Sequence, residues 1–428
     1  MKILLLTVGT RGDVQPFVAL GQGLKARGHE VTICAPVTFE PLITAHGLRY
    51  AYQNDEIIRF IDSDAGRQAM ETADNLLTWI KLAIKMSRQI KPVYRRMLDE
   101  AWAAAPGSEA IIYHPKALGG YDIAEKLDIP GFLSLPFPAY VPTAAFPAVV
   151  FPPWQLGGWI NKLSYVITGR LAQASLGGVV SAWRQESLGL AKRPVLAGEL
   201  VRADGRPVPV LHCYSRHVLP EPADWPETAV VTGYWFLDRK DNWQPPAQLT
   251  DFLAAGPPPV YVGFGSIAGR DPAKATRATI QALAQTGQRG ILATGWGGLQ
   301  TTDLPDTVFK LSAVPHDWLF PRMAAVVHHG GAGTTAAGLR AGVPTVICPF
   351  FGDQPFWGRR VAALGVGPEP VPQKKLTADR LARAIETAIT DPRIRQRAAD
   401  LGAKIRPEDG VKRAVRLIEQ PTVKESHK

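Results

Sequence analysis

The residues best suited to chemistry lie between Val326 and Gln354, in the segment VVHHGGAGTTAAGLRAGVPTVICPFFGDQ. An apolar stretch typical of a strand runs into glycines, and a small-residue helix, a second strand and an Asp-Gln pair follow. Glycine lets backbone amides approach a ligand closely, and a helix that begins there directs its unpaired N–H groups at an anion. This order predicts a bound phosphate, with Asp353 and Gln354 placed to bind hydroxyl groups beside it.

Side chains around the glycines can add to such an anion site. His328 and His329 end the predicted strand, where adjacent residues point to opposite faces, so they cannot share one metal ion. We expect one of them to face the loop, and His329 at the helix start could donate to a phosphate oxygen. The hydroxyls of Thr334 and Thr335 could do the same. The simpler alternative is a tight turn in which Thr334 is only the helix N-cap.

A different ligand is also compatible with this segment. The run from Gly331 to Ala336 fits the relaxed dinucleotide fingerprint GxGxxA, with Asp353 about 20 residues further on. That pattern would indicate an NAD-dependent oxidoreductase. Two features count against it: the segment lies in the second half of the chain, and Asp353 follows a Pro-Phe-Phe-Gly loop instead of ending a strand.

The elements that must position these residues alternate between strand and helix, which predicts an α/β fold of two doubly wound, Rossmann-like domains. In the first half we expect strands at 3–8, 30–35, 110–113 and 131–135, with helices at 15–27 and 121–127. In the second half we expect strands at 260–264, 290–294, 308–311, 325–328 and 345–348, with helices at 273–286, 334–341, 356–364, 376–390 and 393–404.

The chain length of 428 residues allows two domains of about 200 residues each. We predict a first domain over 1–235, a proline-rich linker over 236–259, a second domain over 260–405 and a C-terminal helix and tail over 406–428. Two such domains facing one another would form a cleft at the carboxyl ends of their strands, where ligands bind in doubly wound sheets.

The net charge and the cysteine positions indicate which classes of partner and which compartment fit the chain. A net charge of +10 indicates an anionic partner, and the scattered basic residues, with no nucleic-acid-binding motif, argue against nucleic acid. The three cysteines lie far apart, which fits neither a disulfide framework nor a zinc site and favours a reducing, cytoplasmic compartment. The N-terminal apolar run is shorter than that of a signal peptide, and six prolines argue against a spanning helix over 129–161.

An uncharged, proline-rich stretch from Phe132 to Ile160 is the candidate wall of an apolar pocket, with Phe137, Phe146 and Trp154 as lining residues. The alternative is an irregular loop packed against its own core. Further upstream, 76–97 reads as a basic amphipathic helix interrupted by Pro92. Such a helix can rest on an anionic membrane, or it can simply present a solvated outer face.

Asp13 lies in the segment GTRGDVQP that follows the first predicted strand. Aspartate is a favoured N-cap, so its simplest role is to cap the helix predicted from Gln15. His114, in the segment YHPK, ends another predicted strand. It is either a core or loop histidine or an assistant to Asp13.

Several motifs together resemble the nucleotide-sugar glycosyltransferases of the two-domain GT-B fold, in particular the branch of sterol and antibiotic glycosyltransferases. They are GTRGDVQP at 9–16, VGFGS at 262–266, GWGGL at 295–299, VPHDWLFPR at 314–322, HHGGAGTT at 328–335 and GVPTVICPFFGDQPFW at 342–357. They occur in the family's order and span most of the chain.

The resemblance implies a nucleoside diphosphate sugar in the second domain, with His329 on the pyrophosphate and the Asp353-Gln354 pair on the sugar. Further donor-binding residues implied in this way are Ser266, Val314, His316, Gly331, Gly333, Thr334 and Thr335. Val314 and His316 would border uracil, and Ser266 would contact a phosphate. Ala337 stands where plant relatives have an acidic residue that reads the ribose, so a TDP-sugar remains an alternative to the UDP-glucose that the sterol branch uses.

The resemblance also implies that Asp13 is the general base, in a loop shaped by Arg11 and Gly12. It implies an inverting, metal-independent transfer of glucose to a lipophilic alcohol, giving a β-glucoside with no cofactor besides the nucleotide sugar. A sterol, a terpenoid, a macrolide or a glycopeptide aglycone would fit as acceptor. A catalytically inactive nucleotide-sugar-binding partner protein is a further alternative, although such a protein would not need a base.

Overall fold

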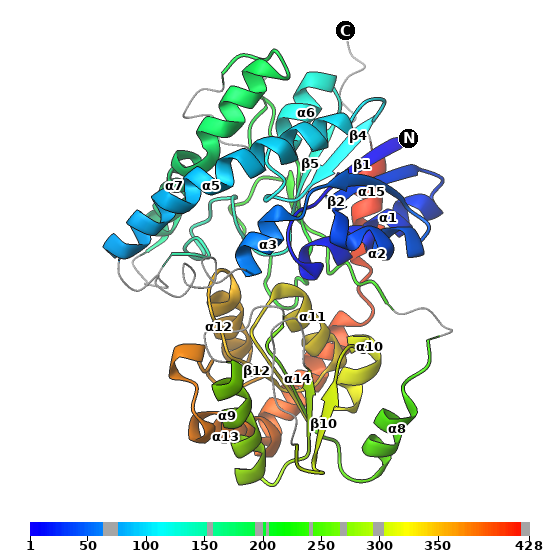
Figure 1. The fold of residues 1–428 in the computed structure, drawn as a ribbon, viewed down its shortest axis with the longest axis vertical. Helices are drawn as coiled ribbons and strands as arrows, with labels where there is room; N and C mark the ends of the chain where they lie inside the picture. The colour runs from blue at the N-terminus through cyan, green and yellow to red at the C-terminus, as the bar shows by residue number, and fades with distance from the viewer. Residues whose placement is uncertain are drawn as a thin grey trace. The chain divides into compact units, whose positions relative to one another are not determined.

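The computed structural model describes residues 1–62, 76–151, 157–192, 200–202, 205–238, 243–265, 272–293 and 304–420 (Figure 1). The chain folds into two compact units. The first unit combines Met1–Leu237 with Asp409–Lys428, and the second is Asp238–Glu408. Each unit is a parallel β-sheet with helices on its faces, which confirms the predicted α/β fold class.

The first unit is built on a seven-stranded sheet in the order β3-β2-β1-β4-β5-β6-β7. Neighbouring strands of this sheet run parallel, and they are β1 (Lys2–Leu6), β2 (Glu30–Pro36), β3 (Arg49–Gln53), β4 (Ala110–Tyr113), β5 (Gly131–Leu135), β6 (Val210–His212) and β7 (Ala229–Val231). Buried apolar clusters lie on both faces of this sheet. A parallel strand that is covered on both faces has a continuous apolar sequence, which explains why the run from Ile3 to Leu6 in β1 could be predicted as a strand.

Helices cover both faces of the first sheet. They are α1 (Arg11–Ala26), α2 (Glu40–Ala45), α3 (Glu56–Asp62), α5 (Leu76–Ala103), α6 (Gly120–Leu127), α7 (Gly158–Glu186) and α15 (Gly410–Glu419), with the 3₁₀ turn η1 (Val37–Phe39). The two long helices α5 and α7 pack against each other (Figure 1).

The second unit has a five-stranded parallel sheet in the order β10-β9-β8-β11-β12. Its strands are β8 (Val260–Gly263), β9 (Gly290–Ala293), β10 (Val308–Leu311), β11 (Ala325–His328) and β12 (Thr345–Ile347). Its helices are α8 (Ala247–Ala254), α9 (Pro272–Gln285), α10 (His316–Leu319), α11 (Ala332–Ala341), α12 (Gln354–Leu364), α13 (Ala378–Thr390) and α14 (Pro392–Ile405), with 3₁₀ turns η2 (Phe320–Arg322) and η3 (Gln373–Lys375).

The C-terminal helix α15 follows the second unit in sequence but belongs to the first unit. It packs on α1, and a Cβ at Gly410 would overlap the backbone of Gly233. Arg27 and His29 both contact the carboxylate of Glu419 near the end of α15. The predicted division at 235 and 405 therefore differs from the structure, in which the chain returns to the first unit after Glu408.

The predicted linker over 236–259 also differs from the structure, because 247–254 forms α8 and packs its Leu249 into the core of the second unit. The helix predicted from Gln15 begins instead at Arg11, four residues earlier. Thr10 occupies the N-cap position there, so the predicted N-cap role of Asp13 is wrong and Asp13 is the third residue of the helix.

Candidate active site

Asp13 is fixed by its own helix start. Its Oδ2 accepts a hydrogen bond from the Thr10 backbone N–H at 2.7 Å and another from Thr10 Oγ1 at 3.2 Å. The Thr7 hydroxyl donates to the Asp13 carbonyl at 2.9 Å. Gly9 has φ +129°, and a Cβ at that position would overlap the Asp13 carboxylate. The loop from β1 to α1 therefore needs glycine at position 9 to hold this carboxylate beside it.

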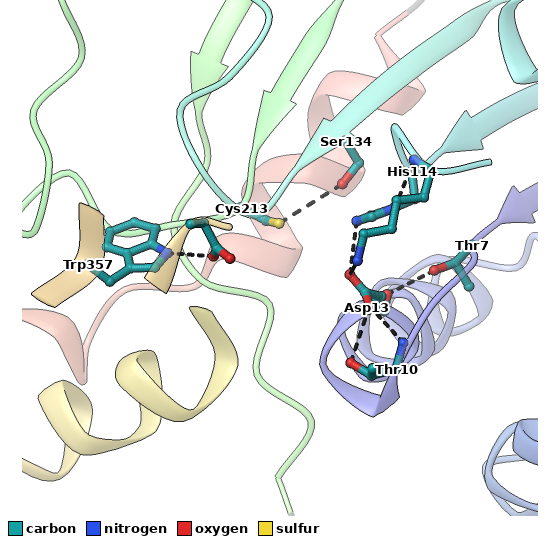
Figure 2. Close-up of polar contacts among 9 residues, drawn as sticks. Thr7, Thr10, Asp13, His114, Ser134, Cys213 and Trp357 are labelled. Atoms are coloured by element: carbon teal, nitrogen blue, oxygen red, sulfur yellow. Dashed lines mark hydrogen bonds and ion pairs between the residues drawn. The ribbon is translucent and has the colours of Figure 1, made fainter. Parts of the chain in front are cut away.

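The other oxygen of Asp13 meets two residues from the loop after β4. Lys116 Nζ lies 2.8 Å from Asp13 Oδ1, and His114 Nε2 lies 3.4 Å from the same oxygen (Figure 2). The side chain of Asp13 is 11% exposed, while that of Lys116 is 49% exposed. Asp13 Oδ2 thus stabilises the start of α1, and Oδ1 faces the Lys116 ammonium group and the His114 ring.

His114 is buried and uncharged at neutral pH. Burial lowers its pKa to about 4, although the nearby Asp13 carboxylate opposes that shift. Its Nδ1 accepts a hydrogen bond from the Lys116 backbone N–H at 3.2 Å, so the neutral ring carries its proton on Nε2. That N–H lies 3.4 Å from Asp13 Oδ1 without forming a hydrogen bond to it, and the ring has no unprotonated nitrogen left to act as a second base.

Asp13 is ionised at neutral pH. Burial by itself raises the pKa of this carboxyl group, but Lys116, His114 and the hydrogen bond from Thr10 together hold it below its usual value. A buried carboxylate with one oxygen directed at polar groups can accept a proton from a ligand hydroxyl.

The sheet topology explains why Asp13 and His114 meet. β1 and β4 are adjacent and parallel, with Leu6 paired to Tyr113, although 103 residues separate Asp13 from Lys116. The chain moves from β1 toward β3 on one side and from β4 toward β7 on the other. The carboxyl ends of β1 and β4 therefore form the topological switch point, where doubly wound sheets bind ligands.

Lys116 is the site residue that the sequence reading missed. A signal was available, because YHPK follows a strand that was predicted and that lies next to β1. The sequence did not indicate that β1 and β4 are neighbours in the sheet, so the contact between Lys116 and Asp13 could not be predicted.

The predicted loop residues Arg11 and Gly12 lie in the first turn of α1, and both are exposed. Arg11 Nε donates to Gln15 Oε1 at 3.0 Å. Among the described residues, neither donates a hydrogen bond to the Asp13 carboxylate, so their role in shaping the loop remains a prediction.

Replacing Lys116 with Met should raise the pKa of Asp13, because it removes an attractive positive charge. A base whose folded-state pKa is low loses activity only as pH falls through that low value. In Lys116→Met this loss should begin at higher pH, which a pH profile of turnover on a chosen acceptor measures. Lys116→Arg should restore the wild-type acid limb. Identical acid limbs for Lys116→Met and the wild-type protein would contradict this electrostatic role.

In the second unit, His329 lies between two glycines. A Cβ at Gly265, which has φ +75°, would come 2.8 Å from His329 Cε1, and a Cβ at Gly331 would come 2.6 Å from its Nε2. Side chains at either position would displace the ring. Burial lowers the pKa of His329 to about 4, and its Nδ1 has no hydrogen-bond partner within the described ranges. The ring is thus a neutral group with an unused polar atom at the glycine-rich turn.

His328 has a different role. It is fully buried, and its Nδ1 accepts a hydrogen bond from the Gly330 backbone N–H at 3.0 Å. The expectation that only one of the two histidines faces the loop agrees with this arrangement.

The N-terminus of α11 supplies backbone donors beside His329. Gly331 is the N-cap, so the N–H groups of Ala332, Gly333 and Thr334 have no acceptor within the helix. The Thr335 hydroxyl is buried and donates to Gly331 O at 3.0 Å, which uses its proton inside the first turn. Thr334, half-buried, is therefore the better-placed hydroxyl for an anion, and the predicted contact from Thr335 has no spare donor.

The Asp353-Gln354 pair lies at the start of α12, next to the same turn. A Cβ at Gly330, which has φ +94°, would come 3.2 Å from the Gln354 carbonyl oxygen. Gln354 Oε1 accepts from the Phe350 N–H at 2.8 Å, which leaves the amide NH₂ as its ligand-binding end. Asp353 Oδ2 accepts from the Trp357 indole N–H at 2.9 Å (Figure 2). The site that the sequence predicted from residues 329–354 is therefore brought together around one switch point, between β8 and β11.

Val314 and His316 lie in the loop before α10 and at its first residue. His316 stacks on Phe320, with ring centroids 4.2 Å apart, and meets the edge of Tyr261. Val314 packs against the apolar cluster that contains Tyr261 and Phe320. Their predicted contact with a base remains a prediction. Ser266 and Trp154 lie outside the described residues, as does the GWGGL motif.

On the predicted acceptor side, Phe137 and Phe146 are half-buried in the loop that follows β5. Asp224 holds this loop: it accepts from Thr143 Oγ1 at 2.6 Å and from the Ala144 N–H at 2.8 Å, and it pairs with Lys162 of α7 at 3.0 Å. These hydrogen bonds, that of Thr143 above all, lower the pKa of Asp224 to about 2. The loop is therefore a fixed structure joined to α7.

Two further findings concern metal and membrane. Among the described residues, no group of three or more His, Cys, Asp or Glu side chains is arranged to hold a metal ion. Within that same part of the chain, no helix combines the length and apolar character needed to cross a bilayer. The predicted amphipathic helix over 76–97 forms the first part of α5, whose side chains lie outside the described set over 76–89, so its basic face remains a prediction.

Two units that are each built on a parallel sheet have the architecture of the GT-B class of glycosyltransferase folds. The solved structure of the glycotransferase of kitacinnamycin is similar to the chain, with a TM-score of 0.70, 20% identity and 98% of each chain covered. Two family models match: the glycosyltransferase family 28 N-terminal domain over residues 3–146 and the erythromycin biosynthesis protein CIII-like C-terminal domain over residues 289–414.

Similar protein sequences indicate the branch of the family. Over 98% of its length the chain is 38% identical to the sterol 3-beta-glucosyltransferase of Aspergillus clavatus and 40% identical to the sterol 3-beta-glucosyltransferase UGT80A2 of Arabidopsis thaliana. It spans 29% of the length of the first and 65% of the second. The chain belongs to the GT-B nucleotide-sugar glycosyltransferases, in the branch that contains the sterol glucosyltransferases and antibiotic glycosyltransferases.

Proposed function

We propose that the protein transfers glucose from UDP-glucose to the hydroxyl group of a lipophilic alcohol, with inversion at the anomeric carbon. The observation that carries this proposal is the ionised Asp13 at the switch point of the first unit, with one oxygen free of helix capping. A protein that only binds nucleotide sugars has no use for such a group. The sterol glucosyltransferases to which the chain is similar support glucose as the sugar and a sterol-like alcohol as the acceptor.

The proposed reaction is a single displacement. The acceptor oxygen forms a bond to the anomeric carbon while the bond from that carbon to the β-phosphate oxygen breaks and UDP leaves. The acceptor proton moves to Asp13 Oδ1, the oxygen that is not engaged by Thr10. Since Lys116 Nζ and the His114 Nε2 proton already face this oxygen, the acceptor hydroxyl must enter beside them. An α-linked donor then gives a β-glucoside.

The departing diphosphate is proposed to lie at the N-terminus of α11. Free N–H groups there and the polar atoms of His329 and Thr334 would stabilise its developing negative charge, with no metal or further cofactor in the scheme. Asp353 and the amide NH₂ of Gln354 would bind the sugar hydroxyls, Ser266 would contact a phosphate, and Val314 and His316 would border the base. TDP-sugars are the alternative donors.

The acceptor is proposed to be bound by the first unit, along the loop that contains Phe137 and Phe146. The test is turnover of radiolabelled UDP-glucose with a panel of sterols, terpenoid alcohols and macrolactones, with and without a chelator. Formation of a β-glucoside is the expected result. The absence of any glycoside, together with micromolar NADH binding, would favour the oxidoreductase alternative instead.

His329→Ala should weaken UDP binding about 10- to 100-fold, the value of a hydrogen bond to a charged group. The ring is held between Gly265 and Gly331, and its Nδ1 has no hydrogen-bond partner in the described part of the molecule, so its loss removes a potential donor to UDP without breaking a hydrogen bond of Nδ1 there. Isothermal titration with UDP measures the effect. His46→Ala, which removes a half-buried histidine of the first unit, is the control and should leave UDP affinity unchanged. Equal UDP affinities for all three proteins would remove His329 from the diphosphate site.

A further inference from the structure

Trp357 is a buried residue of the second unit, and the one polar atom of its side chain contacts the proposed sugar site. It is 1% exposed and lies on the inward side of α12 with Gln354, Gly358 and Val361. Its indole Nε1–H donates to Asp353 Oδ2 at 2.9 Å, one helical turn back along the chain (Figure 2). A buried tryptophan usually finds an acceptor for its N–H, and here that acceptor is the carboxylate proposed to bind sugar hydroxyls.

The Asp353 carboxylate does not cap α12, although Asp353 occupies the N-cap position. Pro355, the second residue of the helix, has no N–H, so one of the two backbone donors that an N-cap side chain usually binds is absent. Asp391 and Asp409 also occupy N-cap positions, and their carboxylates do accept backbone N–H groups, at 2.8 and 2.9 Å. The Asp353 carboxylate is therefore held by a side chain of α12 and not by the backbone of that helix.

Close packing of α12 on the second sheet fixes the position of the indole ring. A Cβ at Gly358 would come 3.2 Å from Ile347 Cγ2 of β12, so glycine at this position lets the helix approach the strand closely. The Phe356 ring meets the indole of Trp357 edge to face, with ring centroids 5.2 Å apart. The indole N–H therefore has a fixed direction, and its hydrogen bond restricts the rotation of the half-buried Asp353 carboxylate.

The two residues of the Asp353-Gln354 pair are oriented in the same manner. Each has one side-chain oxygen that accepts a hydrogen bond from within the second unit, Asp353 from the Trp357 indole and Gln354 from the Phe350 N–H at 2.8 Å. Groups that are already oriented lose less conformational freedom when a ligand binds, so the same hydrogen bonds give a higher affinity.

We propose that Trp357 is a positioning residue for the sugar of the nucleotide-sugar donor. Its N–H keeps the Asp353 carboxylate oriented to accept hydrogen bonds from the sugar hydroxyls, while Trp357 itself stays buried and acts through Asp353. This inference rests on the proposed role of Asp353 in sugar binding. The contribution of Trp357 belongs to the binding of UDP-glucose and not to that of UDP, because UDP lacks the sugar.

Two variants separate the N–H of Trp357 from its bulk. Trp357→Phe keeps an aromatic ring without an N–H, whereas Trp357→His loses the benzene ring but keeps a nitrogen at the position of the indole Nε1, because imidazole superposes on the five-membered ring of indole. Isothermal titration of the full chain measures the affinities for UDP-glucose and UDP in parallel. We expect Trp357→Phe to lower the affinity for UDP-glucose relative to UDP by about tenfold, the order of one hydrogen bond to a charged group. Trp357→His should keep a ratio closer to that of the wild-type protein, even where its stability is lower.

A second buried tryptophan provides the matched control. Trp183 of the first unit is fully buried and donates to a carboxylate oxygen, Asp99 Oδ1, at the same distance of 2.9 Å. Trp183→Phe should leave the affinities for UDP-glucose and UDP unchanged. In an Asp353→Ala background, adding Trp357→Phe should not lower the ratio of the two affinities further, since the group that Trp357 positions is gone. Circular dichroism checks that all variants are folded.

The proposal is overturned if Trp357→Phe changes the affinities for UDP-glucose and UDP by the same factor or changes neither. It is also overturned if Trp357→His has a lower ratio than Trp357→Phe, because the volume of the ring would then matter more than its N–H. If Trp357→Phe does not fold, the ratio of Trp357→His should still exceed that of Asp353→Ala, and equal ratios would contradict the proposal.

These titrations do not require glucose transfer. A wild-type protein that binds UDP-glucose and forms no glycoside would contradict the proposed function and leave the role of Trp357 intact, whereas a wild-type protein that binds neither nucleotide would overturn both.

Discussion

Asp13→Asn should reduce turnover by about 10²–10⁴-fold while UDP affinity stays nearly unchanged. The substitution removes the negative charge that accepts the proton but keeps an amide oxygen that can accept the hydrogen bond from the Thr10 N–H at the start of α1. Lys116 loses its ion-pair partner, yet it is half-exposed and can turn to water. The start of α1 should therefore stay folded, while the rate of glucose transfer falls.

A second aspartate provides the matched control for this substitution. Asp391 caps α14, where its Oδ1 accepts from the Arg393 N–H at 2.8 Å, and it belongs to neither predicted site. Asp391→Asn should leave single-turnover rates on UDP-glucose unchanged. If Asp13→Asn and Asp391→Asn transfer glucose at the same rate, Asp13 is only a helix-start residue and the base must be sought elsewhere.

Sequence patterns predicted the strands that are long enough to show a continuous apolar run. β4 and β5 begin and end where they were expected, at 110–113 and 131–135, and the two-sheet α/β class followed from the alternation. β6 and β7, with three residues each, were missed because so short a run has no period, and no motif lies beside them as the glycine-rich segment lies beside the equally short β12. Most of α7 was missed for another reason: glycines and small residues interrupt it, and an exposed apolar face does not produce the usual polar outer side.

The candidate sites were predicted to different degrees. The phosphate segment from His329 to Gln354 is local in sequence, so its glycines, helix start and Asp-Gln pair could be recognised together. The partners of Asp13 could not, because His114 and Lys116 come from a strand about a hundred residues away and become neighbours only through the order β1-β4. For the same reason the return of α15 to α1 could not be predicted, since nothing in the sequence of α15 indicates the surface on which it packs.

Arg184→Met should lower the free energy of unfolding of the first unit by about 3–5 kcal/mol, the usual cost of breaking a buried ion pair from one side. Arg184, in the last turn of α7, is 5% exposed and holds two carboxylates of α6. Its Nη1 lies 2.7 Å from Asp122, which is 1% exposed, and its Nη2 lies 2.6 Å from Glu125. Its Nε also donates to Ala191 O at 2.7 Å. Methionine fills similar volume but leaves the Asp122 charge buried without its cation. Urea denaturation followed by circular dichroism measures the change.

The source of this instability can be separated from the loss of packing. Adding Asp122→Asn to Arg184→Met removes the uncompensated charge, so the double variant should recover part of the lost stability, as a double-mutant cycle measures. Arg49→Met, which breaks an exposed pair with Glu30 on the same unit, should have only a small effect. If the double variant is less stable than Arg184→Met alone, the hydrogen bonds of Asp122 matter more than its charge. If Arg184→Met is as mild as Arg49→Met, the end of α7 is held by its apolar contacts, with Trp183 fully buried beside it.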